Sequence, residues 1–228
     1  MSQTAQQQTP EATPDEVLDD RARAVAQSLQ DENVQVDEAT MRLILTEARP
    51  HYGWQDRDVS EDKLRQLYDI AKMGPTSMNQ QPMRMIFIRS QEAKDRLAPC
   101  LMPANVVKMQ AAPVTAIIAY DQNFWEELPK LFPPNPNASD IFRNNSTAAQ
   151  VNAFRNSTLQ GAYAMIAARA VGLDVGAMSG FDNAKVDEEF FHGTSLKSNF
   201  LMNLGYADTS KIFRRLPRFA FDEVCQTL

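Results

Sequence analysis

The stretch GPTSMNQQPMR, residues 74–84, connects a helical pattern to an apolar strand pattern. Residues 59–74 repeat apolar side chains every three or four positions, and residues 83–90 are rich in β-branched and aromatic side chains. A plain surface loop could be this polar, but it would not need Pro75 and Pro82 to stiffen both of its ends. The stretch is therefore a candidate for a preorganised binding loop.

Outward from this loop the chain alternates helical and strand patterns. Strand patterns with strong apolar content occupy residues 83–90, 113–121 and 198–206, and a strand-like stretch covers 172–182. Helical patterns precede and separate them, at residues 37–48, 59–74, 91–101, 146–171 and 182–191. This alternation, with apolar strands in the middle, predicts a layered fold in which helices cover a central sheet.

Two segments of the chain suggest a binding site and an interface. Residues 122–145, rich in Pro and Asn, form a long excursion of the kind that usually serves as a lid or binding loop. The helical pattern at 146–171 is apolar nearly all round in its second half and rich in alanine. We expect this helix to lie in the core or in a subunit interface.

The first part of the chain has a different composition. Residues 1–14 are rich in Gln, Thr and Pro, and we expect them to be disordered. Residues 15–30 are helical in composition and could form either a solvated helix or a partner-binding arm. We therefore divide the chain into an N-terminal extension, residues 1–36, and one domain, residues 37–228.

Composition limits the classes of function. Of 228 residues 43% are hydrophobic and 23% charged, and the net charge of −6 argues against nucleic acid as the main partner. No signal-peptide core and no membrane-spanning run is visible, so we expect a cytoplasmic protein without a membrane partner. Two histidines are too few for a His-rich metal site, and Cys100 and Cys225 fit reduced thiols.

No nucleotide or hydrolase motif is present: GxGxxG, the P-loop and the GxSxG elbow are all absent. What remains is a set of polar clusters far apart in the sequence. A cluster of this kind, taken alone, is more often part of the solvated surface than a binding site. The clusters are Arg49-Pro50-His51, the loop residues Thr76, Ser77 and Asn79, the i, i+3 pair Asn105 and Lys108, Ser179-Gly180, and Arg214-Arg215.

Taken together, these clusters and their surroundings resemble a known family. EARPHYGW (47–54), the segment 68–90, NVVKMQAAPVTAIIAYD (105–121), the segment 154–187 and RRLPRFAFDEVC (214–225) are similar in order and spacing to the nitroreductase superfamily of FMN-dependent oxidoreductases. Within it the chain looks closest to the malonic semialdehyde reductases of pyrimidine degradation. The resemblance covers roughly residues 43–228. It implies an α+β, three-layer fold with a central mixed sheet covered by helices, in an intertwined homodimer.

The resemblance also implies where FMN binds. Arg49 and Arg215 match arginines that hold the phosphate, and His51 matches a residue that touches the phosphate or the ribityl chain. Gly53 stands where relatives carry a basic residue near the flavin ring. Which group of this chain supplies that positive charge or hydrogen-bond donor instead is left open.

The remaining matches would surround the flavin ring. Asn105 and Lys108 match a pair at the pyrimidine edge. Ser179 and Gly180 match residues whose backbone N–H groups approach flavin N5 and O4. FMN would lie at the subunit interface, where residues of the opening loop would contact it, partly from the neighbouring subunit. These loop residues are Pro75, Thr76, Ser77 and Asn79.

The implied activity is a ping-pong reaction in which NADH or NADPH delivers hydride through flavin N5 to a small aldehyde, nitro or quinone acceptor. No catalytic side chain is then needed, because the hydride chemistry belongs to the cofactor. The subfamily implies reduction of 3-oxopropanoate to 3-hydroxypropanoate, with Arg84, Arg143 or Arg155 as candidates for its carboxylate. The alternatives are a general nitroaromatic or quinone reductase, and an FMN-binding or partner-binding module without turnover.

Overall fold

The computed structural model describes residues 13–228, so most of the stretch predicted to be disordered, residues 1–12, lies outside the described residues. The chain divides into two compact units, residues 1–41 and 42–228, which we describe separately. The boundary predicted after residue 36 stays a prediction. None of the described helices is long and apolar enough to cross a membrane.

The first unit contains α1 (Pro14–Asp31) and the short α2 (Glu38–Met41). A capping box starts α1: the Thr13 side chain accepts a hydrogen bond from the Glu16 backbone N–H at 3.3 Å, and the Thr13 N–H donates to the Glu16 carboxylate at 2.8 Å. The helix predicted at 15–30 is thus present. Its apolar side chains are exposed, Leu18 at 63%.

The second unit is built on a sheet of four strands, β1 (Met83–Ile88), β2 (Val114–Asp121), β3 (Asp174–Met178) and β4 (Leu196–Gly205). Their order in space is β1-β2-β4-β3, and each neighbouring pair is antiparallel. The predicted mixed sheet is therefore wrong for the described chain. An isolated parallel bridge joins Pro50, which lies outside these strands, to Val175 of β3.

The position of β4 explains this correction. β2 and β3 run in the same direction, as a helix-connected pair often does, but they are not neighbours. β4, the last strand in the sequence, lies between them and is antiparallel to both. Helix–strand alternation predicts a parallel neighbour, and it carries no information about a later strand that inserts into the sheet.

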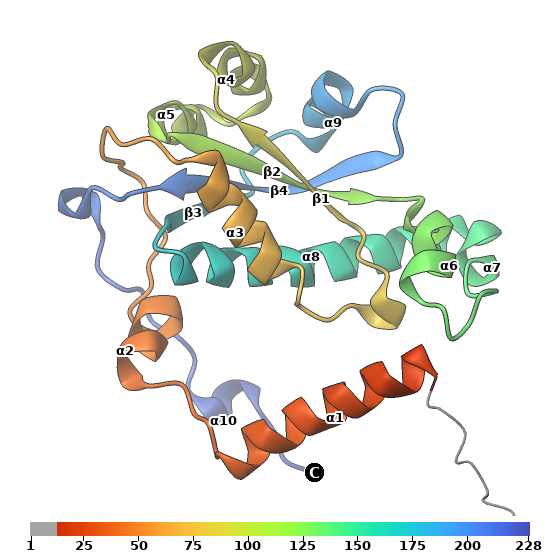
Figure 1. Cartoon of the computed structure of the whole chain (residues 1–228). Coiled ribbons are helices and arrows are strands. Elements are labelled where there is room, and N and C mark those ends of the chain that lie inside the picture. The colour runs from red at the N-terminus through yellow and green to blue at the C-terminus, as the bar shows by residue number, and fades with distance from the viewer. Residues whose placement is uncertain (1–12) are drawn as a thin grey trace, which may run out of the picture. The chain divides into compact units, whose positions relative to one another are not determined.

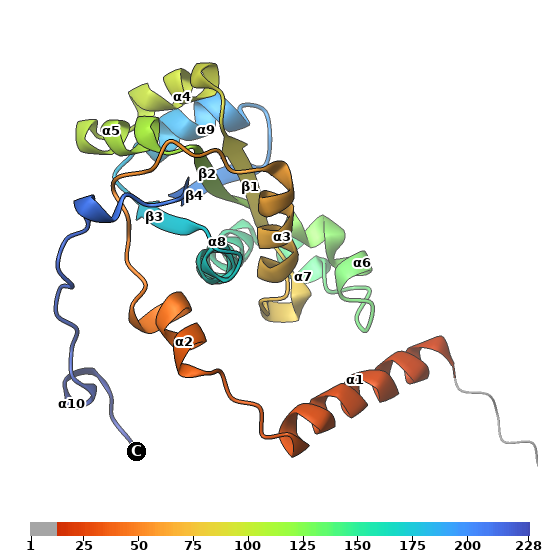
Figure 2. The ribbon, with the colours of Figure 1, turned by 60° about the vertical axis from the view of Figure 1, so that its left-hand side comes forward.

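Helices cover both faces of the sheet, as Figures 1 and 2 show. On one face lie α3 (Glu61–Ala71) and α8 (Ser146–Ala170), and on the other α4 (Gln91–Leu97), α5 (Pro103–Ala111) and α9 (Asn183–Phe191). Strand β2 contributes to both cores, because Ile118 packs toward α3 and α8 while Ile117 packs toward the other helices, each with 0% exposure. The three-layer prediction is confirmed.

Helix α8 is buried along one side. Alanines at 149, 153, 164, 167 and 168 face the interior, so the helix backbone lies close to its neighbours. Large apolar side chains on the other side are exposed: Val151, Phe154, Leu159 and Tyr163, at 41–50%. The buried side of α8 therefore fits the prediction that this helix lies in the core, and a subunit interface stays a prediction.

The excursion at 122–145 is not structureless. It folds into the short helices η4 (Phe124–Glu127), α6 (Leu128–Leu131) and α7 (Asp140–Arg143), which bury an apolar cluster of their own against the start of α8. A π-helical turn, η1 (Arg42–Thr46), replaces the second half of the helix predicted at 37–48. The remaining short elements are η2 (Ser77–Asn79), η3 (Ala98–Cys100), η5 (Thr209–Lys211) and α10 (Phe221–Val224).

The segment after η1 runs against the edge strand β3. The His51 backbone N–H donates to the Val175 carbonyl at 2.9 Å. A Cβ added at Gly176 would collide with the His51 carbonyl oxygen and lie 3.3 Å from the Trp54 ring. Glycine at 176 is what allows this backbone-to-backbone contact.

We predict that Gly176→Ala destabilises the protein by about 1–3 kcal/mol, because a backbone oxygen cannot move aside as a side chain can. Ordinarily alanine would stabilise a strand relative to glycine by roughly 0.5–1 kcal/mol. Urea unfolding measures the difference, with Ala177→Ser at the exposed neighbouring position as control. A variant as stable as wild type would mean that segment 49–54 is free to shift.

Candidate functional site

Arg49 and Arg215, the two arginines predicted to hold a phosphate, lie in the same place. Arg49 donates a hydrogen bond to the Phe213 carbonyl, 164 positions along the chain. Arg215 donates to the carbonyls of Thr46 and Ala48. The chain after β4 thus returns to the segment that runs beside β3, and both arginines line the same pocket.

A pocket of about 640 Å³ opens at this meeting point and is strongly cationic. Its lining includes four arginines, Arg49, Arg214, Arg215 and Arg218. The carboxylate of Glu47 lies 3.9 Å from Arg215 and is 62% exposed. Forked guanidinium groups suit the oxygens of a phosphate better than single ammonium groups do. The pocket therefore has the chemistry of a phosphate site.

A second group of predicted residues meets where α5 approaches the end of β3. The Asn105 side-chain amide donates to the Gly180 carbonyl at 3.0 Å, and its oxygen accepts from Lys108 Nζ at 3.2 Å. A Cβ at Gly180 would lie 2.5 Å from the Asn105 amide nitrogen, so only glycine allows this approach. Ser179 is exposed beside them. Donors from one helix and one loop are thus held side by side.

Tyr52 links the two groups. Lys108 Nζ lies 4.7 Å from the centre of the Tyr52 ring, which is a cation–π distance. On its other side Tyr52 meets Phe213 edge to face, with ring centres 5.6 Å apart. Sequence reasoning missed both aromatic residues. In the sequence, each of the two stands close to an arginine cluster, and nothing more marks it. The fold shows that the Tyr52 and Phe213 rings are in contact.

His51 is buried beside this row. Its Nε2 lies 3.3 Å from the Asp174 carboxylate, while Nδ1 is buried and has no partner within residues 13–228. Burial lowers the pKa of His51, Asp174 opposes that shift, and the charges of Arg169 and Arg49 add to it. The imidazole is therefore neutral at pH 7.

Gly53 is packed against a cation. A Cβ at Gly53 would lie 2.5 Å from Cδ of Lys211, so the lysine stem fills the space that a side chain at 53 would need. Lys211 Nζ itself lies 3.5 Å from Asp208 and is exposed.

The loop residues Pro75, Thr76, Ser77 and Asn79 lie elsewhere. Asn79 donates to the Leu131 carbonyl of α6 at 2.8 Å, and the Ser77 N–H donates to Asn156 in the first half of α8. Arg169, near the other end of α8, donates to the Ile44 carbonyl close to the arginine pocket. The two positions on α8 are roughly 20 Å apart along the helix. Within one chain the structure therefore splits the predicted site in two (Figure 1).

The three arginines considered for a substrate carboxylate differ in their surroundings. Arg84 is paired with Asp121 at 2.7 Å. Arg143 lies 3.5 Å from Asp140 and stacks over Trp125. Arg155 lines a separate pocket of about 810 Å³ on α8, together with Tyr120 and Phe154. Among these three, Arg155 alone has no ion-pair partner within residues 13–228.

No metal site is evident in the described part of the chain. Within residues 13–228, no three His, Cys, Asp or Glu side chains gather so that they could hold a metal ion. Cys100 is buried and Cys225 exposed, and neither forms a disulfide.

The chain matches known proteins over most of its length. The model of the nitroreductase family matches residues 46–206. A Ralstonia pickettii protein that carries the name NADH dehydrogenase/NAD(P)H nitroreductase HadB is 51% identical over 188 residues, which is 82% of this chain and 96% of that protein.

Solved structures share the fold at low identity. A nitroreductase-like protein from Exiguobacterium sibiricum, in complex with FMN, has a TM-score of 0.73 at 20% identity and covers 85% of this chain and 99% of its own. An NAD(P)H:FMN oxidoreductase-like protein from Staphylococcus epidermidis has a TM-score of 0.74 at 14% identity, over 86% and 98%. The family match, the close relative and the common fold agree: the chain belongs to the nitroreductase family.

Proposed function

We propose that the protein is an FMN-dependent NAD(P)H oxidoreductase that acts on small acceptors. One observation carries the proposal: a four-arginine pocket continues through Tyr52 into the row formed by Lys108, Asn105 and Gly180. A flavin mononucleotide has a phosphate at one end and a ring with hydrogen-bonding edges at the other. The names and the bound FMN of relatives support the same cofactor.

The phosphate would bind in the arginine pocket. Arg49 and Arg215 now donate to carbonyl oxygens of the chain, and the exposed guanidinium edges remain available to a dianion. His51 does not line this pocket, and with its Nε2–H directed at Asp174 its Nδ1 is an acceptor, which would suit a ribityl hydroxyl rather than the phosphate. The residues present fit a phosphate monoester.

The ring end would meet Lys108, Asn105 and the backbone after β3. Bound FMN supplies the hydride-accepting and hydride-donating chemistry. The chain supplies a positive charge at Lys108 and an amide at Asn105, both fixed by mutual hydrogen bonding. Fixed donors aimed at developing charge are worth roughly 3–4 kcal/mol each in known mutant enzymes.

A second copy of the chain would complete the site. Loop 75–82 lies away from the arginine pocket in its own chain, so its predicted contacts with FMN require the loop of a partner subunit. The exposed apolar side chains of α8 offer a surface for such a homodimer. A cytoplasmic location and the division of the chain after residue 36 also stay proposals.

For the acceptor we favour a nitro compound or a quinone. The name of the relative at 51% identity includes NAD(P)H nitroreductase, and Arg84, one candidate for a carboxylate, is already paired with Asp121. Reduction of 3-oxopropanoate is the second candidate, favoured by the resemblance to that subfamily and by Arg155, which lines a pocket and has no ion-pair partner in the described part of the chain. NADH and NADPH both remain candidates for the electron donor.

Steady-state turnover distinguishes the acceptors. With FMN present, we expect kcat/KM for nitrofurazone to exceed that for 3-oxopropanoate by about tenfold or more, with either NADH or NADPH as donor. The reverse ranking would establish the aldehyde as the substrate. Binding of FMN without oxidation of either nucleotide would instead support a flavin-binding module.

Arg215→Ala should weaken FMN binding by about ten- to a hundredfold, the equivalent of ~1.5–3 kcal/mol for a charged hydrogen bond. The melting temperature of the apoprotein should change little, because the hydrogen bonds of Arg215 to the Thr46 and Ala48 carbonyls are exposed and water can replace them. Fluorescence titration with FMN measures the first effect, and Arg65→Ala, on the outer surface of α3, is the control. Equal FMN affinity in wild type and Arg215→Ala would show that the phosphate binds elsewhere.

Lys108→Met should lower the two-electron reduction potential of bound FMN by about 30 mV or more, a shift that corresponds to ~1.4 kcal/mol. A positive charge near the ring favours the reduced, more negative cofactor, so its removal makes reduction harder. Spectroelectrochemical titration measures the potential, with Lys185→Met on the exposed side of α9 as control. An unchanged potential would place Lys108 away from the ring.

A further inference from the structure

The loop that connects α3 to β1 has an unusual backbone. Met78, Asn79 and Gln81 have positive φ angles of 51°, 50° and 41°. Only one other non-glycine residue of the described chain, Asn33, shares this conformation. Left-handed backbone is unfavourable for residues with a side chain and persists only where the surroundings hold it. The contacts that hold this loop are therefore of interest.

Helix α8 holds the loop from one side through Asn156. Its side-chain oxygen accepts from the Ser77 backbone N–H at 2.8 Å, and its amide nitrogen donates to Gln80 Oε1 at 3.1 Å. Asn156 is 2% exposed and Gln80 1%. One turn further along α8, Gln160 accepts from the Met83 N–H at 3.0 Å, where β1 begins.

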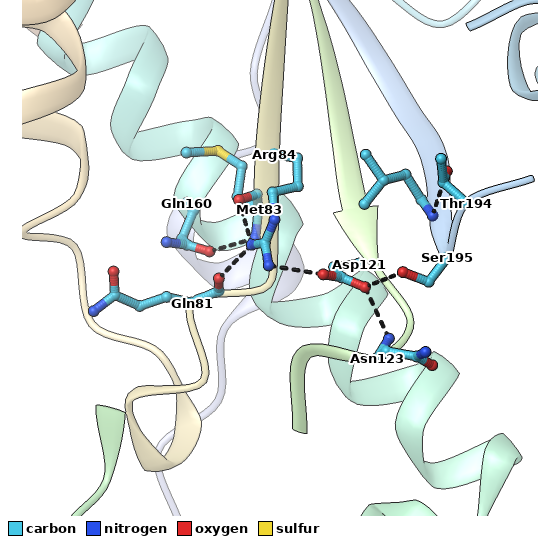
Figure 3. A network of polar contacts seen from close by, with 9 residues as sticks. Gln81, Met83, Arg84, Asp121, Asn123, Gln160, Thr194 and Ser195 are labelled. Carbon is cyan, nitrogen blue, oxygen red and sulfur yellow. Dashed lines mark hydrogen bonds and ion pairs between the residues drawn. The ribbon is translucent and has the colours of Figure 1, made fainter. Parts of the chain in front are cut away.

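The sheet holds the end of the loop from the other side (Figure 3). Arg84 donates to the Gln81 and Met83 carbonyls, each at 3.1 Å, and forms an ion pair with Asp121 at 2.7 Å. The Asp121 carboxylate also accepts from the Ser195 hydroxyl at 2.6 Å and from the Asn123 N–H at 2.9 Å. This network fixes where the loop joins β1, whereas Asn156 bonds to Ser77 and Gln80, which stand on either side of the left-handed residues Met78 and Asn79.

Asn156 is one of two buried amide side chains on α8, the other being Gln160. The buried face of α8 consists largely of alanine, and an amide there is costly unless it is hydrogen-bonded. Both ends of the Asn156 amide are used, and apart from one bond to the Asn152 carbonyl they serve the loop. An alanine or leucine at 156 would satisfy packing, but it would leave the Ser77 N–H and the Gln80 side chain without these partners.

We propose that Asn156 is a positioning residue for the cofactor site: through Ser77 and Gln80 it holds loop 75–82 in the conformation that contacts the flavin ring. The inference rests on the proposed function, because the loop meets FMN only in that proposal. It also assigns the loop to the ring rather than to the phosphate, since the arginine pocket provides the phosphate contacts.

The test compares FMN with riboflavin, which has the same ring and lacks the phosphate. Asn156→Ala should weaken binding of both flavins by a similar factor, about tenfold or more, because a loosened loop loses its contact with the ring. Arg215→Ala should weaken FMN and leave riboflavin nearly unchanged. Asn152→Ala is the matched control, because this half-buried amide, one turn earlier, donates within residues 13–228 to the Ala148 carbonyl of α8 and not to the loop.

Amide hydrogen exchange of the apoprotein gives a second readout, independent of flavin. Exchange over residues 75–83 should become faster in Asn156→Ala and stay as in wild type in Asn152→Ala. Gln80→Met, which removes the partner amide from the loop side, should show the same direction in case Asn156→Ala folds poorly.

The outcomes separate the two claims. Wild-type protein that binds neither flavin would refute the proposed function. Wild-type protein that binds both flavins, with unchanged affinities and unchanged exchange in Asn156→Ala, would refute only the role of Asn156. A loss confined to FMN in Asn156→Ala would also refute it, because that pattern belongs to the phosphate.

Discussion

The insertion of β4 between β2 and β3 is the constraint on which the rest of the second unit depends. As the last strand in the sequence, it pairs with β2 on one side and β3 on the other, so the sheet closes only when it is in place. Its insertion sets the position of the β3 end, which carries Ser179 and Gly180 to α5. It also directs the following chain toward Arg49. The insertion of this one strand thus brings together residues from three distant parts of the sequence.

The arginine pocket shows why such convergence points to a ligand. Four guanidinium groups around one cavity repel one another, and the nearby carboxylate of Glu47 is largely exposed. Gathering like charges does not stabilise the folded chain, whereas it strengthens the binding of an anion. The carbonyl oxygens that Arg49 and Arg215 now contact keep both side chains in place, so a bound phosphate would meet groups already oriented toward it.

Local pattern in the sequence predicted most helices and strands, because burial on one or both faces leaves a periodic signal. The antiparallel pairing could not be predicted that way, since strand order depends on contacts between distant segments. Motifs predicted Arg49, Arg215, Asn105 and Lys108 as one site, and the structure places them along one row. Tyr52 and Asn156 carried no such signal: an aromatic residue or an amide looks the same in a sequence whether or not it touches a binding loop.

The contact between Arg49 and Phe213 has a consequence for biosynthesis. Synthesis proceeds from the N-terminus, and contacts distant in sequence form late. A nascent chain that has not yet released residue 213 from the ribosome lacks the partner of Arg49 and one wall of the cationic pocket. The cofactor would then bind only after residue 213 has left the ribosome, so flavin loading would follow the synthesis of the segment that forms this wall.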